Sequence, residues 1–125
     1  SYIGFGGTGK QVRDVLHVRD LFDLLLLQFE RFDSLAGKTY NVGGGRPMSV
    51  SLLELTRLCE RATGRTIAID AVPENRANDI PVYLTDHRRV TRELGWRPTR
   101  TVETVVEDIA RWITDHRAAL EPILS

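Results

Sequence analysis

Cysteine and histidine are scarce in this sequence, which limits the chemistry that it can support. Cys59 is the only cysteine among 125 residues, so an internal disulfide and a thiolate metal cluster are both excluded. We expect Cys59 to be a small buried thiol on a helix, because no base can be placed beside it to make a nucleophile. His17, His87 and His116 do not share a metal-ligand spacing. The sequence therefore predicts no metal site, and it contains no signature of a catalytic triad or a zinc centre.

A surplus of one charge and a long apolar run are also lacking. Lys plus Arg number 17 and Asp plus Glu number 17, so the net charge of zero gives no reason to expect nucleic acid or a membrane as a partner. The run Leu24–Leu27 is much too short to span a bilayer, and no signal peptide is visible. We therefore expect a cytoplasmic protein. The chain begins at Ser1 inside a segment with strand character, and we expect it to be a piece of a longer protein.

The hydrophobic content of 42% suffices for a core, and helical and alternating apolar patterns together predict an α/β fold. Short strands are expected at Tyr2–Phe5, Gln11–His17, Thr39–Gly43 and Thr66–Val72. About four helices are expected: Asp20–Phe32, one from Ser49 or Ser51 to Thr63, His87–Leu94, and one starting at Thr101 or Thr104. The glycine-rich turn at 6–9 predicts a hairpin-like pairing of the first two strands.

Local signals refine these elements. Asp20 occupies the position of an N-cap or a first-turn acid, and Glu54 follows Ser51 at the spacing of a capping box. The helix Asp20–Phe32 is apolar around most of its circumference, which predicts burial on more than one side. Trp96 and Trp112 are expected to pack in the core.

Two glycine runs resemble nucleotide-binding loops without completing one. Gly4–Gly9 followed by Lys10 is close to a phosphate-binding loop, but Gln11 stands where Ser or Thr would bind magnesium, and a strand follows instead of a helix. Gly43–Gly45 follows a predicted strand, but Pro47 intervenes before the next helix. We interpret both runs as turns, and we expect no cofactor-binding residues in this chain.

A better candidate for a ligand site consists of two arginines and an aspartate. Arg13 lies on a strand that is otherwise rich in apolar residues, and Arg76 and Asp79 lie in a polar loop between Pro73 and Pro81. Two guanidinium groups converging from separate segments suit a diphosphate, because each offers paired donors in a planar fork. Asp79 can accept from a sugar hydroxyl. The alternative is ordinary surface ion pairing, worth roughly 0–1 kcal/mol.

The motifs also resemble a known family. Gln11–Asp20 (QVRDVLHVRD), Tyr40–Gly43 (YNVG), Arg76–Asp79 (RAND) and Leu94–Pro98 (LGWRP) occur in the order seen in extended short-chain dehydrogenases/reductases. The chain looks like the NAD-dependent nucleotide-sugar epimerases and dehydratases of that family. Its opening, Tyr2–His17, is most similar to the CDP-paratose 2-epimerase (CDP-tyvelose epimerase) subfamily.

The resemblance implies that residues 1–125 are one domain, the C-terminal nucleotide-sugar-binding part of a Rossmann-type enzyme that carries its NAD-binding domain elsewhere. It implies that Arg13 and Arg76 contact the nucleotide diphosphate and that Asp79 lies near the ribose. The strand Ile3–Phe5 would border the base, which makes Ile3 and Phe5 further candidates for substrate binding. The family often has glycine where this chain has Asn78.

The resemblance also implies what the chain does not do. The family's glycine-rich NAD loop and its Tyr-x-x-x-Lys pair are both missing from this sequence, so no catalytic residue is assigned and the chain alone is expected to be inactive. In the parent enzyme, bound NAD oxidises a sugar carbon and the keto sugar is then reduced again from the opposite face, which makes the cycle redox-neutral.

Three readings of the function remain. The first is a nucleotide-sugar 2-epimerase acting on a CDP-sugar, and the second is a 4-epimerase or 4,6-dehydratase acting on another nucleotide sugar. The third is a non-catalytic binding module. The resemblance further implies that the helix Asp20–Phe32 and the strand Thr39–Gly43 pack against the NAD domain. We therefore expect the isolated chain to expose apolar surface at Leu24–Leu27 and either to self-associate as a homo-oligomer or to rearrange its pairing.

Overall fold

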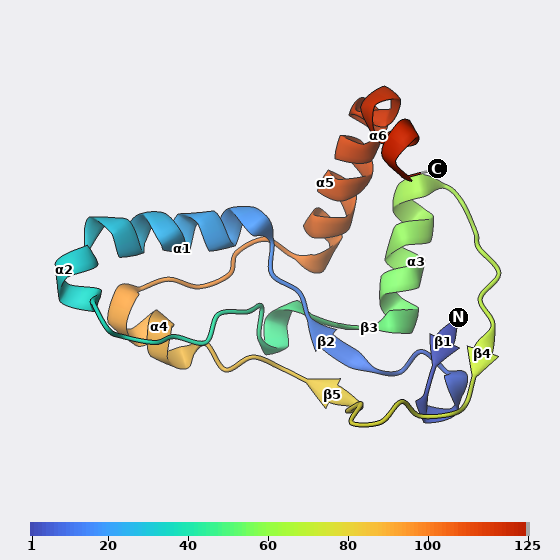
Figure 1. The fold of residues 1–125 in the computed structure, drawn as a ribbon, viewed down its shortest axis with the longest axis horizontal. Coiled ribbons are helices and arrows are strands. Elements are labelled where there is room, and N and C mark those ends of the chain that lie inside the picture. Colours follow the sequence, from blue (N-terminus) through green and yellow to red (C-terminus); the bar gives the residue numbers. More distant parts are fainter. Residues whose placement is uncertain (125) are drawn as a thin grey trace.

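The computed structural model describes residues 1–124, which form two arms joined by a short central sheet (Figure 1). The helices are α1 (Val18–Glu30), α2 (Phe32–Leu35), α3 (Leu52–Thr63), α4 (Arg88–Leu94), α5 (Val102–Asp115) and α6 (Arg117–Leu124). The strands are β1 (Tyr2–Ile3), β2 (Val12–Asp14), β3 (Ser49–Ser51), β4 (Ala71–Val72) and β5 (Val82–Tyr83). Two 3₁₀ turns, η1 (Phe5–Gly7) and η2 (Arg46–Met48), complete the elements. The mixture confirms the predicted α/β class.

Strand β2 is the centre from which both arms start. It pairs antiparallel with β3 and parallel with β5, so that Arg13 lies opposite Val50 on one side and Tyr83 on the other. Strand β1 pairs instead with β4, in parallel, and the predicted hairpin of the first two strands is therefore wrong. The cause is η1, where Phe5 and Gly6 take φ values of 48° and 77° and turn the chain away from β2.

Helix α1 begins at Val18 and is capped by His17, whose Nδ1 accepts a hydrogen bond from the Arg19 amide at 3.0 Å. Asp20 lies in its first turn, as one of the two predicted placements had it. The Asp20 side chain is almost fully buried and binds the segment that leads into α5 through Thr99 and Arg100. This contact ties the two arms together.

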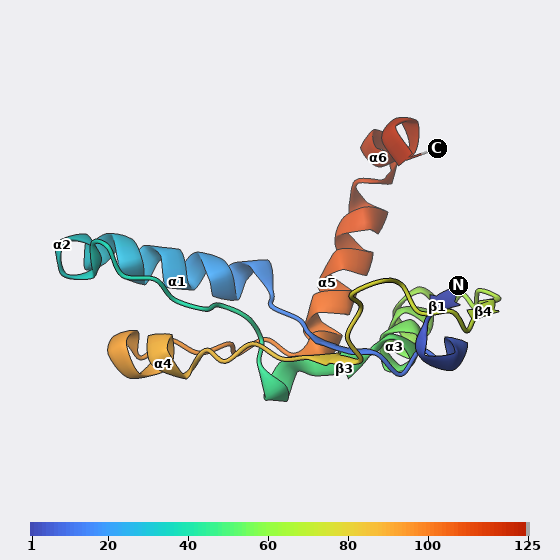
Figure 2. The same cartoon turned by 60° about the horizontal axis from the view of Figure 1, so that its bottom comes forward.

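Two small cores hold the arms. In the arm formed by α1 and α4, Leu24, Val90, Leu94 and Trp96 form one buried cluster, which confirms the prediction for Trp96. In the other arm, α3 packs against α5 over the cluster Val50, Leu58, Val102 and Val106. Figure 2 shows the first arm as two layers, α1 over α4, with α5 rising from the junction.

The ends of the helices agree with their sequence signals. The Ser51 hydroxyl accepts from the Glu54 amide while the Glu54 carboxylate accepts from the Ser51 amide, which is the predicted capping box. Gly64 closes α3 in the left-handed conformation, and Gly95 closes α4 in the same way. Thr101, one of the two predicted caps, is the N-cap of α5.

Several predictions of strand and burial are wrong. Thr39–Gly43 runs as an irregular segment because no described strand lies beside it to complete a ladder, and Thr66–Val72 keeps only β4. Cys59 and Trp112 are exposed rather than buried, since they lie on faces of α3 and α5 that point away from the shared core.

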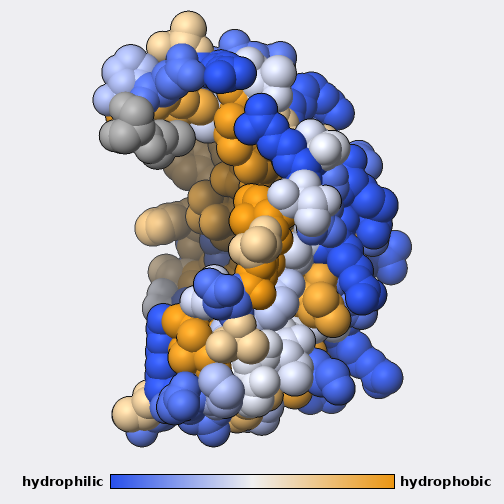
Figure 3. Space-filling view, turned by 90° about the vertical axis from the view of Figure 1, so that its right-hand side faces the viewer, coloured by the Kyte–Doolittle hydropathy of each residue, from blue (hydrophilic) through white to orange (hydrophobic). Residues whose placement is uncertain are grey.

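Apolar surface is exposed on both arms. Among the leucines and phenylalanines of α1, Leu24 is buried. The exposed ones are Leu21, Phe22, Leu25, Leu26 and Phe29. The prediction that α1 is buried on more than one side is wrong for this chain, because α4 and its neighbours cover a single side. Figure 3 shows a second apolar region, along a hollow between the end carrying α6 and the end carrying β1. No helix within residues 1–124 is long and apolar enough to cross a membrane.

Candidate functional site

A cleft of about 320 Å³ lies where β1, β2, the start of α3 and the loop before β5 meet. Its lining residues are Ser1, Ile3, Gln11, Arg13, Leu52, Arg76 and Asp79. Four of the five substrate-binding residues predicted from the sequence are in this set. They come from three separate segments of the chain, so their convergence is produced by the tertiary fold.

Arg13 and Asp79 form an ion pair in the cleft. Arg13 Nη2 donates to Asp79 Oδ1 at 3.0 Å, and Arg13 Nη1 donates to the carbonyl oxygen of Val12 at 2.8 Å. A guanidinium carries five N–H groups, so these contacts occupy two of them. The Arg13 side chain is 39% exposed, which leaves its remaining donors within reach of a ligand. The pairing predicted as the alternative to ligand binding is therefore present, and it leaves capacity for an anion.

Arg76 and Asp79 occupy the two ends of one turn, in which the Asp79 amide donates to the Arg76 carbonyl oxygen at 3.2 Å. Asn78 within this turn has a φ of 64°. Asparagine tolerates this left-handed conformation better than most side chains do, so it can stand where glycine is otherwise favoured. Among the described residues, the Arg76 side chain forms no hydrogen bond or ion pair, and its guanidinium is free to meet an anion.

Ile3 lines the cleft, but Phe5 does not. Phe5 begins η1 with a positive φ, and its amide donates to Asn75 Oδ1 at 2.5 Å. The structure thus brings together Ile3, Arg13, Arg76 and Asp79 and places Phe5 outside the group.

Sequence reasoning missed three of the cleft residues, Ser1, Gln11 and Leu52, of which Gln11 alone is buried. It is 5% exposed, and its Nε2 donates to the Ile3 carbonyl oxygen at 2.5 Å and to Asp79 Oδ2 at 3.4 Å. The available signal was the position of Gln11, which is the first residue of the family motif that also contains Arg13.

The opposite face of β2 supports the cleft from behind. Asp14 Oδ2 accepts from the Gly45 amide at 2.8 Å, so the strand holds the glycine-rich loop in place. Burial opposes the ionisation of Asp14, but hydrogen bonds from Gly45 and Thr85 outweigh it and keep the pKa of the carboxyl below its usual value.

Neither glycine run fits the pyrophosphate of a dinucleotide. A Cβ on Gly44 or Gly45 would collide with Met48 or with His87, so this loop is filled by the chain's own atoms. Gly7 packs equally closely against Ala71, where a Cβ would lie 2.6 Å from the Ala71 Cβ. Both runs are turns, as predicted, and neither opens a long helix whose N-terminus could face a phosphate.

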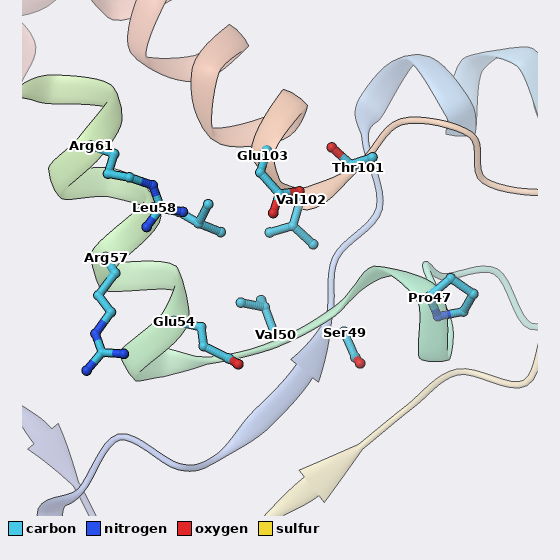
Figure 4. A pocket seen from close by; sticks show the side chains of 10 residues that line it. All are labelled: Pro47, Ser49, Val50, Glu54, Arg57, Leu58, Arg61, Thr101, Val102 and Glu103. Carbon is cyan, nitrogen blue, oxygen red and sulfur yellow. The ribbon is translucent and has the colours of Figure 1, made fainter.

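A second cleft, of about 410 Å³, lies between α3, α5 and β3 (Figure 4). Its floor is part of the second core, at Val50, Leu58 and Val102, and Arg57 and Arg61 extend from α3 along its rim. None of the substrate-binding residues predicted from the sequence lines it.

Comparisons with known proteins identify a family and several relatives. A family model described as GDP-mannose 4,6 dehydratase matches residues 3–109. The chain is 32% identical over 106 residues to a CDP-paratose 2-epimerase of Salmonella typhi, which covers 85% of this chain and 31% of that protein. It is 35% identical over 107 residues to a UDP-glucose 4-epimerase of Erwinia amylovora, which covers 85% of this chain and 30% of that protein.

A solved structure shares the fold. The UDP-glucose 4-epimerase of Stenotrophomonas maltophila, crystallised with NAD and formylated UDP-arabinopyranose, superimposes with a TM-score of 0.77 at 32% identity. The match covers 95% of this chain and 36% of that protein. The chain therefore spans about a third of the length of the relatives that it matches.

Proposed function

The chain belongs to the GDP-mannose 4,6-dehydratase family of extended short-chain dehydrogenases/reductases, and from this premise we propose that it is the nucleotide-sugar-binding domain of an NAD-dependent nucleotide-sugar epimerase. Residues 1–125 form that single domain. The observation that carries the proposal is the convergence of Arg13 and Arg76, from a strand and a loop far apart in sequence, on one cleft.

Each cleft residue has a role in this proposal. The guanidinium groups of Arg13 and Arg76 bind the two phosphates, because planar forks of N–H donors match phosphate oxygens. The Asp79 carboxylate accepts from a ribose hydroxyl, and Ile3 packs against the base. Two arginines and one aspartate leave a surplus of one positive charge, which suits a diphosphate.

The redox chemistry belongs to NAD, which supplies and receives hydride in enzymes of this kind. The two glycine runs of this chain do not fit that cofactor, and the role that we assign to the cleft residues is to bind and orient the sugar nucleotide. The relatives differ in the base of the nucleotide sugar that their names give. The Salmonella protein is a CDP-paratose 2-epimerase, and the Erwinia protein is a UDP-glucose 4-epimerase. We favour a CDP-sugar, because the opening Tyr2–His17 most resembles the former, and a UDP-sugar 4-epimerase is the second candidate. A cytoplasmic location would suit such a substrate.

The exposed face of α1 is where we place the contact with the NAD-binding domain of such an enzyme. Six of its large apolar side chains, Val18 and the five named above, are exposed in this chain, and exposed apolar side chains gathered on one helix are typical of an interaction site. A second copy of the chain would occupy the same face when that domain is absent.

Isothermal titration with CDP, UDP and NAD tests the proposal. We expect CDP to bind and Arg76→Ala to weaken binding by about 10- to 100-fold, the equivalent of about 1.5–3 kcal/mol for a charge-assisted contact. The matched control is Arg117→Ala, which removes an exposed arginine of α6 that pairs with Glu121. Equal affinity of Arg76→Ala and Arg117→Ala for CDP would refute the assigned role.

A further inference from the structure

The side-chain amide of Gln11 has hydrogen-bond partners for its nitrogen but none for its oxygen among the described residues. Its two partners, the Ile3 carbonyl oxygen and the Asp79 carboxylate, are both acceptors, so the amide nitrogen must be the atom that faces them. Oε1 consequently points elsewhere. It is buried, and no described residue donates to it.

Buried acceptors are nearly always paired, so an unpaired one needs an explanation. Gln11 as a whole is 5% exposed, yet it belongs to the lining of the cleft. Its Nε2 also links the segment assigned to the base, through Ile3, with the side chain assigned to the ribose, Asp79. The side-chain amide of Gln11 therefore lies at the nucleoside end of the proposed site.

We propose that Gln11 determines nucleotide specificity: its Oε1 accepts a hydrogen bond from a donor group of the bound nucleoside, while its Nε2 keeps Ile3 and Asp79 in position. The inference rests on the proposed function of the cleft. Two donors of cytidine can be removed one at a time, namely the exocyclic amino group of cytosine and the ribose 2′-hydroxyl. UDP lacks the first, and 2′-deoxy-CDP lacks the second.

The test combines substitutions in the protein with deletions in the ligand. Gln11→Lys retains N–H donors for Ile3 and Asp79 but has no acceptor, whereas Gln11→Met has no donor and only a weakly accepting sulfur, and is similar in size. Gln28→Lys makes the same chemical change on α1, away from the cleft, and serves as the matched control. Circular dichroism and thermal melting verify that each variant is folded.

In the unmodified chain, we expect either UDP or 2′-deoxy-CDP to bind about tenfold more weakly than CDP, which is the usual effect of one lost hydrogen bond. In Gln11→Lys and Gln11→Met, that preference should fall to about one, and in Gln28→Lys it should persist. The donor is identified by the ligand that binds more weakly than CDP in the unmodified chain and equally well in the Gln11 variants.

Two results overturn the inference, and they are distinct. If the preference among the three nucleotides is the same in Gln11→Lys as in the unmodified chain, Oε1 is satisfied by water and Gln11 has only a structural role. If no nucleoside diphosphate binds the unmodified chain, the proposed function fails together with the inference.

Discussion

Replacing Asp20 by asparagine tests how the two arms of the molecule are held together. The Asp20 carboxylate is 1% exposed and accepts from the Thr99 amide at 3.2 Å, the Thr99 hydroxyl at 2.9 Å, the Arg100 amide at 3.1 Å and Arg100 Nη1 at 2.6 Å. Asparagine keeps the shape but loses the charge, and its NH₂ group faces a donor instead of accepting from it. We expect the free energy of unfolding to fall by about 2–4 kcal/mol, the usual effect of breaking a buried charged contact.

The structure provides a matched control in Asp23, which pairs with the same Arg100 Nη1 at 2.9 Å but whose side chain is 52% exposed. Asp23→Asn should cost about 0–1 kcal/mol, because solvent screens an exposed pair. Urea denaturation followed by circular dichroism measures both variants. Equal destabilisation by Asp20→Asn and Asp23→Asn would refute the claim that burial makes Asp20 the link between the arms.

The same carboxyl makes stability depend on pH. Burial opposes its ionisation, but hydrogen bonds from Arg100 and Thr99 outweigh burial and lower the pKa of Asp20 below its usual value of 3.8. A group whose pKa is lower in the folded state stabilises the fold above its unfolded pKa and loses that contribution as pH falls through the folded pKa. Between pH 4 and pH 2, stability should therefore fall less steeply in Asp20→Asn than in the unmodified chain. A slope unchanged by the substitution would contradict this.

Three further predictions concern the fold and its exposed surface. Ser51→Ala removes the capping box of α3 and should cost about 1 kcal/mol in urea denaturation, whereas Ser49→Ala, whose hydroxyl donates only to the Arg46 carbonyl oxygen, should cost less. Gly43→Ala drives a Cβ to within 2.6 Å of Asp14 Oδ2, so thermal melting should show destabilisation by about 1–3 kcal/mol, and an unchanged melting temperature would refute the close packing. Leu25 and Phe29 are 52% and 82% exposed on α1. Changing both to glutamate should shift the chain from oligomer to monomer, as measured by light scattering. If the unmodified chain is a monomer at high concentration, the expected self-association is contradicted.

Local signals predicted α1, α3, α4 and α5, because these signals act over a few residues, but they did not predict α2 and α6. The capping box at Ser51 lies where the sequence placed it, and α3 and α4 end at Thr63 and Leu94 as predicted, each followed by a left-handed glycine. Strand pairing depends on distant partners, so the sequence could not indicate that β1 joins β4 across the positive-φ turn at Phe5. The prediction of burial for α1 was wrong for the same reason. Its apolar pattern is compatible with neighbours on two sides, and only the tertiary structure shows that neighbours cover a single side.

The candidate site was predicted in part. Arg13, Arg76 and Asp79 were identified by residue type and by family motif, and the tertiary structure places them in one cleft. Phe5 was proposed from the family resemblance alone, and in the structure it lies in the turn η1 and does not line the cleft. Gln11 was missed because its importance lies in an unpaired oxygen, which only coordinates reveal.

The central claim is that Arg13 and Arg76 bind a nucleoside diphosphate in this cleft. The most direct test is isothermal titration of the chain with CDP, beside UDP and with NAD as the negative control, repeated with Arg13→Ala. We expect CDP to bind, NAD not to bind, and Arg13→Ala to lose at least tenfold in affinity while remaining folded. Undiminished CDP affinity in a folded Arg13→Ala variant would contradict the account.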